Sequence, residues 1–395
     1  MSFSSAWPPA ADTLVDVARV LILGGGFGGI ATAVALRAAL PDDAEVVLVD
    51  RREEFVMGLR KTWYVLGISP LAYGERPLVL LRERGIDYRH GEIQAIDVAT
   101  RSATVNGETI GADALVIALG ARHAPAEVPG LAEHGLNGWT REGLEHVAAG
   151  IDVFRGGRVV VGVFGQPYSC PPAPYELALL LADRLEERGT DADLTVFTPA
   201  PITLPIVGAA GCVPLDARLE ERGISFLPGR VATSVEPGEV HFSDGAALPF
   251  DLLLAVPPHR VPSVIVDAGL ASANGWIKVD RETGETGHEG VYAIGDCTAI
   301  GLSNGMPLPK AGLFAQKEGE AVASRIAARL RGEEPTATFD GAGACFIEMG
   351  GGEASMVRGD FFRDPPEAEL TAPSHAQREE KEAFEADRLA AWFGG

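Results

Sequence analysis

A glycine-rich turn between an apolar strand and an alanine-rich helix restricts the fold of this chain more than any other feature. Apolar residues 20–23 precede three glycines in the spacing GxGxxG, and a helix is predicted over residues 30–40. The first glycine of such a turn permits the tight bend, the second lets a pyrophosphate approach bare backbone, and the third lets the helix pack close to the strand. The positive end of the helix dipole then faces the phosphates. We therefore predict a dinucleotide site that includes Gly24, Gly26, Phe27, Gly28 and Gly29.

Acidic and glycine residues at the ends of later apolar segments extend this site. Asp50 follows apolar residues 46–49, about 20 residues beyond the last glycine, where a carboxylate accepts hydrogen bonds from ribose hydroxyls. Residues 115–121 read LVIALGA, and residues 290–296 read GVYAIGD, whose aspartate suits the ribityl chain of a flavin. In this order the three segments resemble the motifs of flavoproteins with two dinucleotide-binding domains, so the predicted cofactor is FAD. The predicted contacts in these segments are Asp50, Arg51, Ala118, Gly120, Gly295 and Asp296.

Composition and charge exclude several classes of function. A chain of 395 residues is long enough for about two or three domains. A net charge of −22 leaves no basic surface for a nucleic acid. No run of eighteen apolar residues predicts a membrane span, and no leader pattern precedes residue 20, so we expect a cytoplasmic location. The four cysteines lack CxxC spacing and no HExxH is present, so no metal site is predicted.

Alternating strands and helices predict an α/β fold with two Rossmann-like, doubly wound domains. Residues 158–165 resemble the opening strand, and a predicted helix and the strand at 194–197 follow them. Proline-rich joints at 124–129 and 256–262 are expected to cross between the domains. The prediction is an FAD-binding domain over 14–125 and 275–325, a second Rossmann-like domain over 126–274, and a C-terminal segment over 326–395.

The second domain lacks the glycine spacing of a nucleotide site. Residues 162–176 read GVFGQPYSCPPAPYE, where four prolines and two tyrosines stand in place of open backbone amides. This crowding disfavours a bound nicotinamide dinucleotide. The loop presents a cysteine, Cys170, at this point instead.

The cysteine loop resembles that of the sulfide:quinone oxidoreductases and of the flavocytochrome c sulfide dehydrogenase flavoprotein. The sequences VPPHR at 256–260, LPKAG at 308–312 and ACFIEMG at 344–350 are also similar, and the resemblance covers roughly residues 18–350. It implies that Cys170 and Cys345 form a redox pair beside the flavin. Sulfide would attack a bridge between these cysteines, and electrons would pass through FAD to a quinone or a redox protein. A lowered thiol pKa in the proline-rich turn would favour this chemistry.

The resemblance also suggests roles for neighbouring residues, and the chain departs from the family at one cysteine position. Glu176 is expected to cap its helix or to relay protons. Lys310, followed by Ala311, is expected either near the flavin pyrimidine edge or in a surface salt bridge. No cysteine lies between residues 50 and 73, where the flavocytochrome relatives attach flavin, so FAD is predicted to be noncovalent. Cys212 and Cys297 are interpreted as structural.

Three further questions stay open from the sequence alone. The apolar positions 384, 389, 392 and 393 are expected to pack on the chain itself or on a second subunit, so peripheral contact with the inner face of the cell membrane and homo-oligomerisation remain undecided. The enzymatic alternative is an NAD(P)H:acceptor reductase like the type II NADH dehydrogenases. A non-catalytic alternative is a flavin-binding subunit that docks a redox partner.

Overall fold

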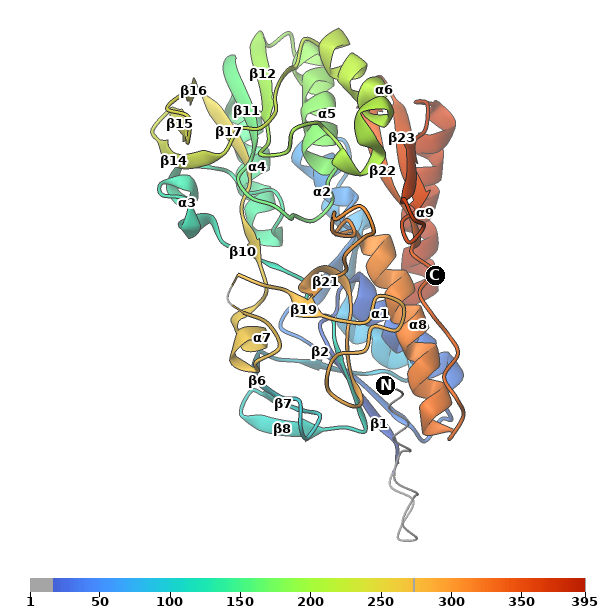
Figure 1. Cartoon of the computed structure of the whole chain (residues 1–395). Helices are drawn as coiled ribbons and strands as arrows, with labels where there is room; N and C mark the ends of the chain where they lie inside the picture. Colours follow the sequence, from blue (N-terminus) through green and yellow to red (C-terminus); the bar gives the residue numbers. More distant parts are fainter. Residues whose placement is uncertain (1–16, 273, 395) are drawn as a thin grey trace.

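The first core of the computed structural model, which describes residues 17–272 and 274–394, is a five-stranded parallel sheet (Figure 1). Its central strands are aliphatic runs buried on both faces, as expected for a parallel sheet with covered faces. One edge strand comes from a distant part of the chain, so the sheet joins two separate stretches. In spatial order the strands are β20 (Val291–Ala293), β9 (Ala114–Ile117), β1 (Arg19–Leu23), β2 (Glu45–Asp50) and β5 (Asp87–His90).

Helices α1 (Phe27–Ala39) and α8 (Gly312–Leu330) pack against each other and against this sheet. Small residues permit their close contact, because a Cβ built on Gly319 would lie 2.6 Å from the Gly28 carbonyl oxygen. Helix α1 begins at Phe27, within the glycine turn, three residues before the predicted start at residue 30. The predicted domain boundary at 325 falls inside α8, and the predicted residues 14–16 and 395 lie outside the described residues.

Smaller elements surround the first core. An antiparallel meander packs with α7 (Ser263–Asp267), and its strands are β6 (Ile93–Asp97), β7 (Ser102–Val105) and β8 (Glu108–Gly111). Two short strand pairs flank the sheet: β3 (Glu54–Val56) with β4 (Glu75–Pro77), and β19 (Ile277–Lys278) with β21 (Thr298–Ala299). The buried residues of α2 (Arg60–Val65) belong instead to the hydrophobic core of the second sheet. The 3-10 helices are η1 (Leu71–Tyr73), η2 (Leu78–Arg84), η3 (Pro125–Glu127), η4 (Pro205–Val207) and η5 (Gly295–Cys297).

A second parallel sheet forms the other core, drawn in green to yellow at the top of Figure 1. Its strand order is β13 (Ser225–Leu227), β12 (Ala192–Phe197), β11 (Gly157–Val163) and β17 (Leu252–Val256). The accompanying elements are α3 (Leu131–His134), α4 (Arg141–Val153), α5 (Ala173–Glu187), α6 (Gly208–Glu221), β14 (Ala232–Glu236), β15 (Glu239–Phe242) and β16 (Ala247–Pro249). The predicted α/β class with two Rossmann-like sheets is confirmed.

A pair of short strands and a C-terminal unit connect these cores. The crossing strands β10 (Arg122–His123) and β18 (His259–Arg260) pair antiparallel between the two sheets (Figure 1). The C-terminal unit, drawn in red, consists of β22 (Ala342–Gly350), β23 (Glu353–Asp360), β24 (Glu367–Leu370) and α9 (His375–Phe393).

The end of α9 packs on the first core. The Trp392 ring lies 5.2 Å from the Phe27 ring and 5.5 Å from the Phe55 ring, measured between centroids, and Leu389 and Phe393 are buried beside them. The apolar C-terminal stripe thus packs largely on its own chain. In the part of the chain that the structure describes, no helix combines the length and apolar character needed to cross a bilayer.

Candidate active site

The glycine turn has the geometry that a dinucleotide requires. Gly24 has φ +109°, and a Cβ there would lie 2.3 Å from the Ala118 carbonyl oxygen. A Cβ on Gly29 would lie 1.8 Å from the Gly24 oxygen. By contrast, no described atom lies within 4 Å of a Cβ built on Gly26, and no described side chain caps α1. Open backbone at a helix N-terminus fits the pyrophosphate of FAD.

A substitution at Gly26 should therefore weaken cofactor binding without disturbing the fold. Gly26 has φ −90°, which alanine adopts freely, so we expect Gly26→Ala to fold normally. Its methyl group would occupy the space for the pyrophosphate, and the FAD dissociation constant should rise roughly tenfold or more. Flavin fluorescence during titration measures this change. Gly287→Ala, at an exposed glycine with equally open surroundings, is the matched control, and equal FAD affinity in both variants would contradict the assignment.

Asp50 is held by a neighbouring guanidinium rather than left free. Its Oδ2 atom accepts from the Gly25 amide at 2.5 Å and from Arg52 Nη2 at 2.8 Å. Burial alone would raise the pKa of Asp50, but the hydrogen bonds and charge of Arg52 bring it below its usual value. Arg51, the predicted contact, is exposed, whereas the arginine that pairs with Asp50 is Arg52.

The Cys170 loop meets the two distant cofactor segments. The Ser169 hydroxyl donates to the Asp296 carboxylate, and the Cys170 amide donates to the Lys310 carbonyl oxygen at 2.7 Å. Ala311 is buried at the N-cap of α8, while Gly120 has φ +63° with open space around it. Residues far apart in the sequence thus form one site.

Lys310 lies inside the protein, so the expected surface salt bridge is wrong. Its Nζ donates to the carbonyl oxygens of Asp296 at 2.7 Å and Thr298 at 3.0 Å. The same ammonium lies 3.6 Å from the centre of the Trp276 ring. Burial lowers the pKa of Lys310, although Asp296 opposes this shift. The lysine therefore holds the Gly295–Asp296 turn in place.

Cys170 and Cys345 are free thiols, and the two residues that follow Cys170 share a pocket with Cys345. Cys170 has φ +58°, a left-handed conformation that costs a non-glycine residue about 1–2 kcal/mol. Cys345 lies on β22 and lines an apolar pocket of about 300 Å³ together with Pro171, Pro172, Pro309 and Phe314. Burial raises the pKa of Cys170 to about 12 and that of Cys345 well above its usual value. The expected lowering of the thiol pKa is therefore wrong for the protein without ligands, because burial outweighs the turn.

Glu176 does not cap its helix, and the capping expectation is wrong. Its Oε2 accepts from Lys381 Nζ at 2.8 Å and from the Glu348 amide at 2.9 Å. Lys381 also donates to Glu348 Oε1 at 2.8 Å, and the Trp63 indole donates to the same carboxylate. Burial raises the pKa of Glu176, and Lys381 opposes the shift. We call Glu176, Glu348 and Lys381 the buried triad; no local sequence pattern indicated its last two members.

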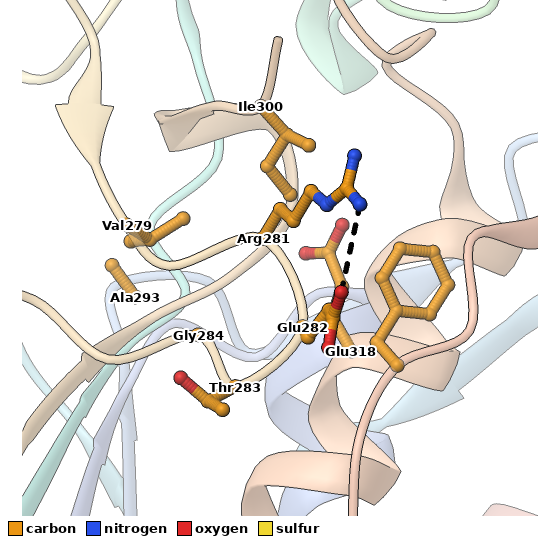
Figure 2. Close-up of a pocket in the computed structure, with 9 residues that line it drawn as sticks. Val279, Arg281, Glu282, Thr283, Gly284, Ala293, Ile300 and Glu318 are labelled. Carbon is orange, nitrogen blue, oxygen red and sulfur yellow. Dashed lines mark ion pairs between the residues drawn. The ribbon is translucent and has the colours of Figure 1, made fainter. Parts of the chain in front are cut away.

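Glu318 is a second buried acid that the sequence did not reveal. Figure 2 shows it beside a pocket of about 210 Å³ lined by Arg281, Glu282 and Thr283. Its Oε2 accepts from the Gly295 amide at 2.5 Å. Burial raises the pKa of Glu318 to about 7, so the protein holds this proton more tightly than the unfolded chain does.

This raised pKa predicts a pH-dependent stability. The favourable contribution of protonated Glu318 is complete below its unfolded pKa and is lost as pH rises to about 7. Glu318→Gln should therefore match the parent near pH 4 and exceed its unfolding free energy by up to about 3 kcal/mol at pH 8. Urea unfolding at both pH values measures the difference. The exposed Glu289→Gln should show no such gain; a pH-independent effect at Glu318 would refute the prediction.

The remaining cysteines lie apart from the pair. Cys212 is buried on α6, where its thiol donates to the Leu204 carbonyl oxygen at 3.4 Å. Cys297 is buried in η5, with its thiol 3.2 Å from the Ile294 carbonyl oxygen. Both contacts are consistent with the structural roles expected for them.

Two Rossmann-like sheets, a dinucleotide turn and an interdomain cysteine loop define a two-domain flavoprotein oxidoreductase. The chain belongs to the pyridine nucleotide-disulphide oxidoreductase family, whose model matches residues 18–164 and 175–319. The predicted FAD cofactor is confirmed by this membership. The matched residues leave out 165–174, which contain Cys170, and everything after 319, where Cys345 lies.

Individual relatives confirm the resemblance stated from the sequence. The chain is 27% identical over 378 residues to the sulfide-quinone reductase of Aquifex aeolicus, covering 88% of this chain and 84% of that protein. It is 27% identical over 332 residues to the demethylphylloquinone reductase NdbB of Synechocystis, covering 80% of both. The solved structure of the Aquifex aeolicus sulfide:quinone oxidoreductase has a TM-score of 0.87 at 24% identity, with 96% of this chain and 92% of that chain covered. The last comparison confirms the fold.

Proposed function

We propose that this protein is a sulfide:quinone oxidoreductase-like enzyme that oxidises sulfide, or a related small sulfur compound, through Cys170 and Cys345. The observation that supports it is the position of these two free thiols: Cys345 lines an apolar pocket with Pro171 and Pro172, which follow Cys170, and the Cys170 amide donates to Lys310 in a cofactor segment. The names of two relatives, a sulfide-quinone reductase and a demethylphylloquinone reductase, favour a quinone as the electron acceptor.

The residues around the pair suit sulfur chemistry. Hydrosulfide attacking a Cys170–Cys345 bridge breaks that bond, forming a persulfide on one cysteine and a thiolate on the other. The pocket that would receive the sulfur chain is lined by apolar side chains. Glu176 disfavours a Cys170 thiolate and Lys381 favours it, so a proton accepted by Glu176 would stabilise the thiolate. Bound FAD supplies the two-electron acceptor.

An aromatic surface suited to a planar acceptor lies on the face of β22 opposite to Cys345. Phe346 and Phe384 are half-buried, with ring centroids 5.8 Å apart. The Arg388 guanidinium lies 4.7 Å from the Phe384 ring centre and donates to Gln316 at 2.8 Å. Two rings and a nearby cation suit the face and carbonyl oxygens of a quinone.

An anaerobic titration of the flavin absorbance tests the proposal. Sulfide is expected to bleach the FAD, and a quinone to restore its colour, whereas NADH should leave it oxidised. Bleaching by NADH alone would support an NAD(P)H:acceptor reductase. If neither reductant bleaches the flavin, the non-catalytic subunit that docks a redox partner becomes the better interpretation.

A further inference from the structure

The crossing strands bring two histidines together at the junction of the two sheets. His123 on β10 is the direct cross-strand partner of His259 on β18. Their ring centroids lie 4.4 Å apart, with an angle of 55° between the ring planes. Neither residue was singled out from the sequence, because only the antiparallel register brings them together.

Hydrogen bonds fix complementary tautomers of the two rings. His259 Nδ1 lies 2.8 Å from the Pro257 carbonyl oxygen, which can only accept, so Nδ1 carries the proton and Nε2 has a free lone pair. His123 Nδ1 lies 3.3 Å from the Asn137 amide nitrogen, which can only donate, so His123 carries its proton on Nε2. His259 is 0% exposed, and its Nε2 has no hydrogen-bond partner in the described part of the chain.

The surroundings keep both rings neutral. Burial lowers the pKa of His123 to about 3, and His259 and Lys61 add to the effect. Burial also lowers the pKa of His259, where Lys310 and Lys61 oppose protonation while Pro257 and Asp296 favour it. The pair therefore offers one donor, one acceptor and no charge.

A continuous set of contacts joins this pair to the Cys170 loop. Asn137, the partner of His123, accepts from the Trp139 amide at 2.9 Å, and the Trp139 indole donates to the Ser169 carbonyl oxygen at 3.2 Å. The Asp296 carboxylate acts electrostatically on His259 and on both redox cysteines. The orphaned nitrogen thus belongs to the same interdomain region as the thiols.

We propose that the His123–His259 pair holds neutral hydrogen sulfide, or the S–H group of a small thiol, before it reaches Cys170, a proposal that rests on the proposed function. The S–H group donates to His259 Nε2, and the sulfur accepts from His123 Nε2. A neutral ligand matches the uncharged rings and enters a buried site at less cost than an anion. The net charge of −22 also repels hydrosulfide from the protein as a whole.

Rapid-mixing measurements of FAD bleaching separate binding at this pair from chemistry at the cysteines. His259→Leu removes one neutral hydrogen bond, so its half-saturating sulfide concentration should rise roughly three- to tenfold with an unchanged limiting rate. His259→Gln keeps an acceptor oxygen and should remain close to the parent. His146→Leu, at an exposed histidine on α4, is the control. An unchanged half-saturation in His259→Leu, or a loss confined to its limiting rate, overturns the proposal.

A binding measurement without turnover distinguishes this proposal from the proposed function. In the Cys170→Ser, Cys345→Ser double variant with ¹⁵N-labelled histidine, sodium sulfide should shift the His259 Nε2 resonance. If the parent flavin is not bleached but this resonance shifts, the site stands and the proposed function fails. If the resonance responds to removal of FAD but not to sulfide, the orphaned nitrogen belongs to the cofactor and the proposal is overturned.

Discussion

Replacing either Cys170 or Cys345 with serine is expected to slow sulfide-driven bleaching of FAD on the order of 10⁴-fold. Serine has a similar size but cannot form the persulfide, so the chemistry stops while the pocket stays packed. The flavin-to-protein ratio should remain that of the parent. Anaerobic rapid-mixing absorbance measures the rate, and flavin released by denaturation measures the ratio.

The double variant and a matched control sharpen this expectation. Because the two sulfurs act as one unit, the double variant should be scarcely slower than either single variant. Cys212→Ser changes a buried thiol on α6 that does not line the pocket, and should react like the parent. Sulfide turnover at the parental rate in both single variants would show that the cysteines are incidental.

Replacing Lys381 with methionine is expected to lower the free energy of unfolding by about 3–5 kcal/mol. Lys381 is fully buried between the carboxylates of Glu176 and Glu348, so its removal leaves Glu176 without a cation and Glu348 with only Arg378, whose Nε lies 3.5 Å away. Urea unfolding followed by circular dichroism measures the loss. The exposed Lys278→Met, on β19, should change stability little.

The same variant has a predictable dependence on pH. Burial raises the pKa of Glu176, so lowering the pH protonates this acid and removes its uncompensated charge, and the deficit of Lys381→Met should narrow from pH 8 to pH 5. Adding Glu348→Gln should also restore part of the lost stability. If Lys381→Met unfolds at the parental urea concentration at every pH, the triad contributes no net stability.

Local patterns predicted the sheets and the glycine turn, because each depends on a few consecutive residues. Gly24 is required by its φ of +109° and Gly29 by its contact with the Gly24 oxygen, both within the strand–turn–helix unit, and the strand at 114–117 is apolar on both faces. Arg51 was expected to contact the cofactor, and the pairing of Arg52 with Asp50 was not predicted, since the direction of the chain after β2 decides which arginine folds back. The pattern of apolar residues in the sequence does not indicate the direction that the chain takes after a strand.

Features that depend on long-range packing could not be predicted. The triad joins α5, β22 and α9, and nothing near Glu176 in the sequence marks Lys381 as its partner. The thiol pKa of Cys170 was expected to fall because a turn was considered without its burial. The histidine pair likewise exists only through the register of two short crossing strands.

The two cysteines of the pair lie on two different structural units. The distance between their sulfurs therefore depends on how these units pack against each other. Cys170 precedes α5, Cys345 lies on β22, and the Glu348 amide bonded to Glu176 fastens one element to the other. A small separation of these elements would part the sulfurs while leaving each sheet intact. Turnover should therefore disappear at a lower urea concentration than secondary structure, and return on dilution, so that inactivation and unfolding become two distinct transitions.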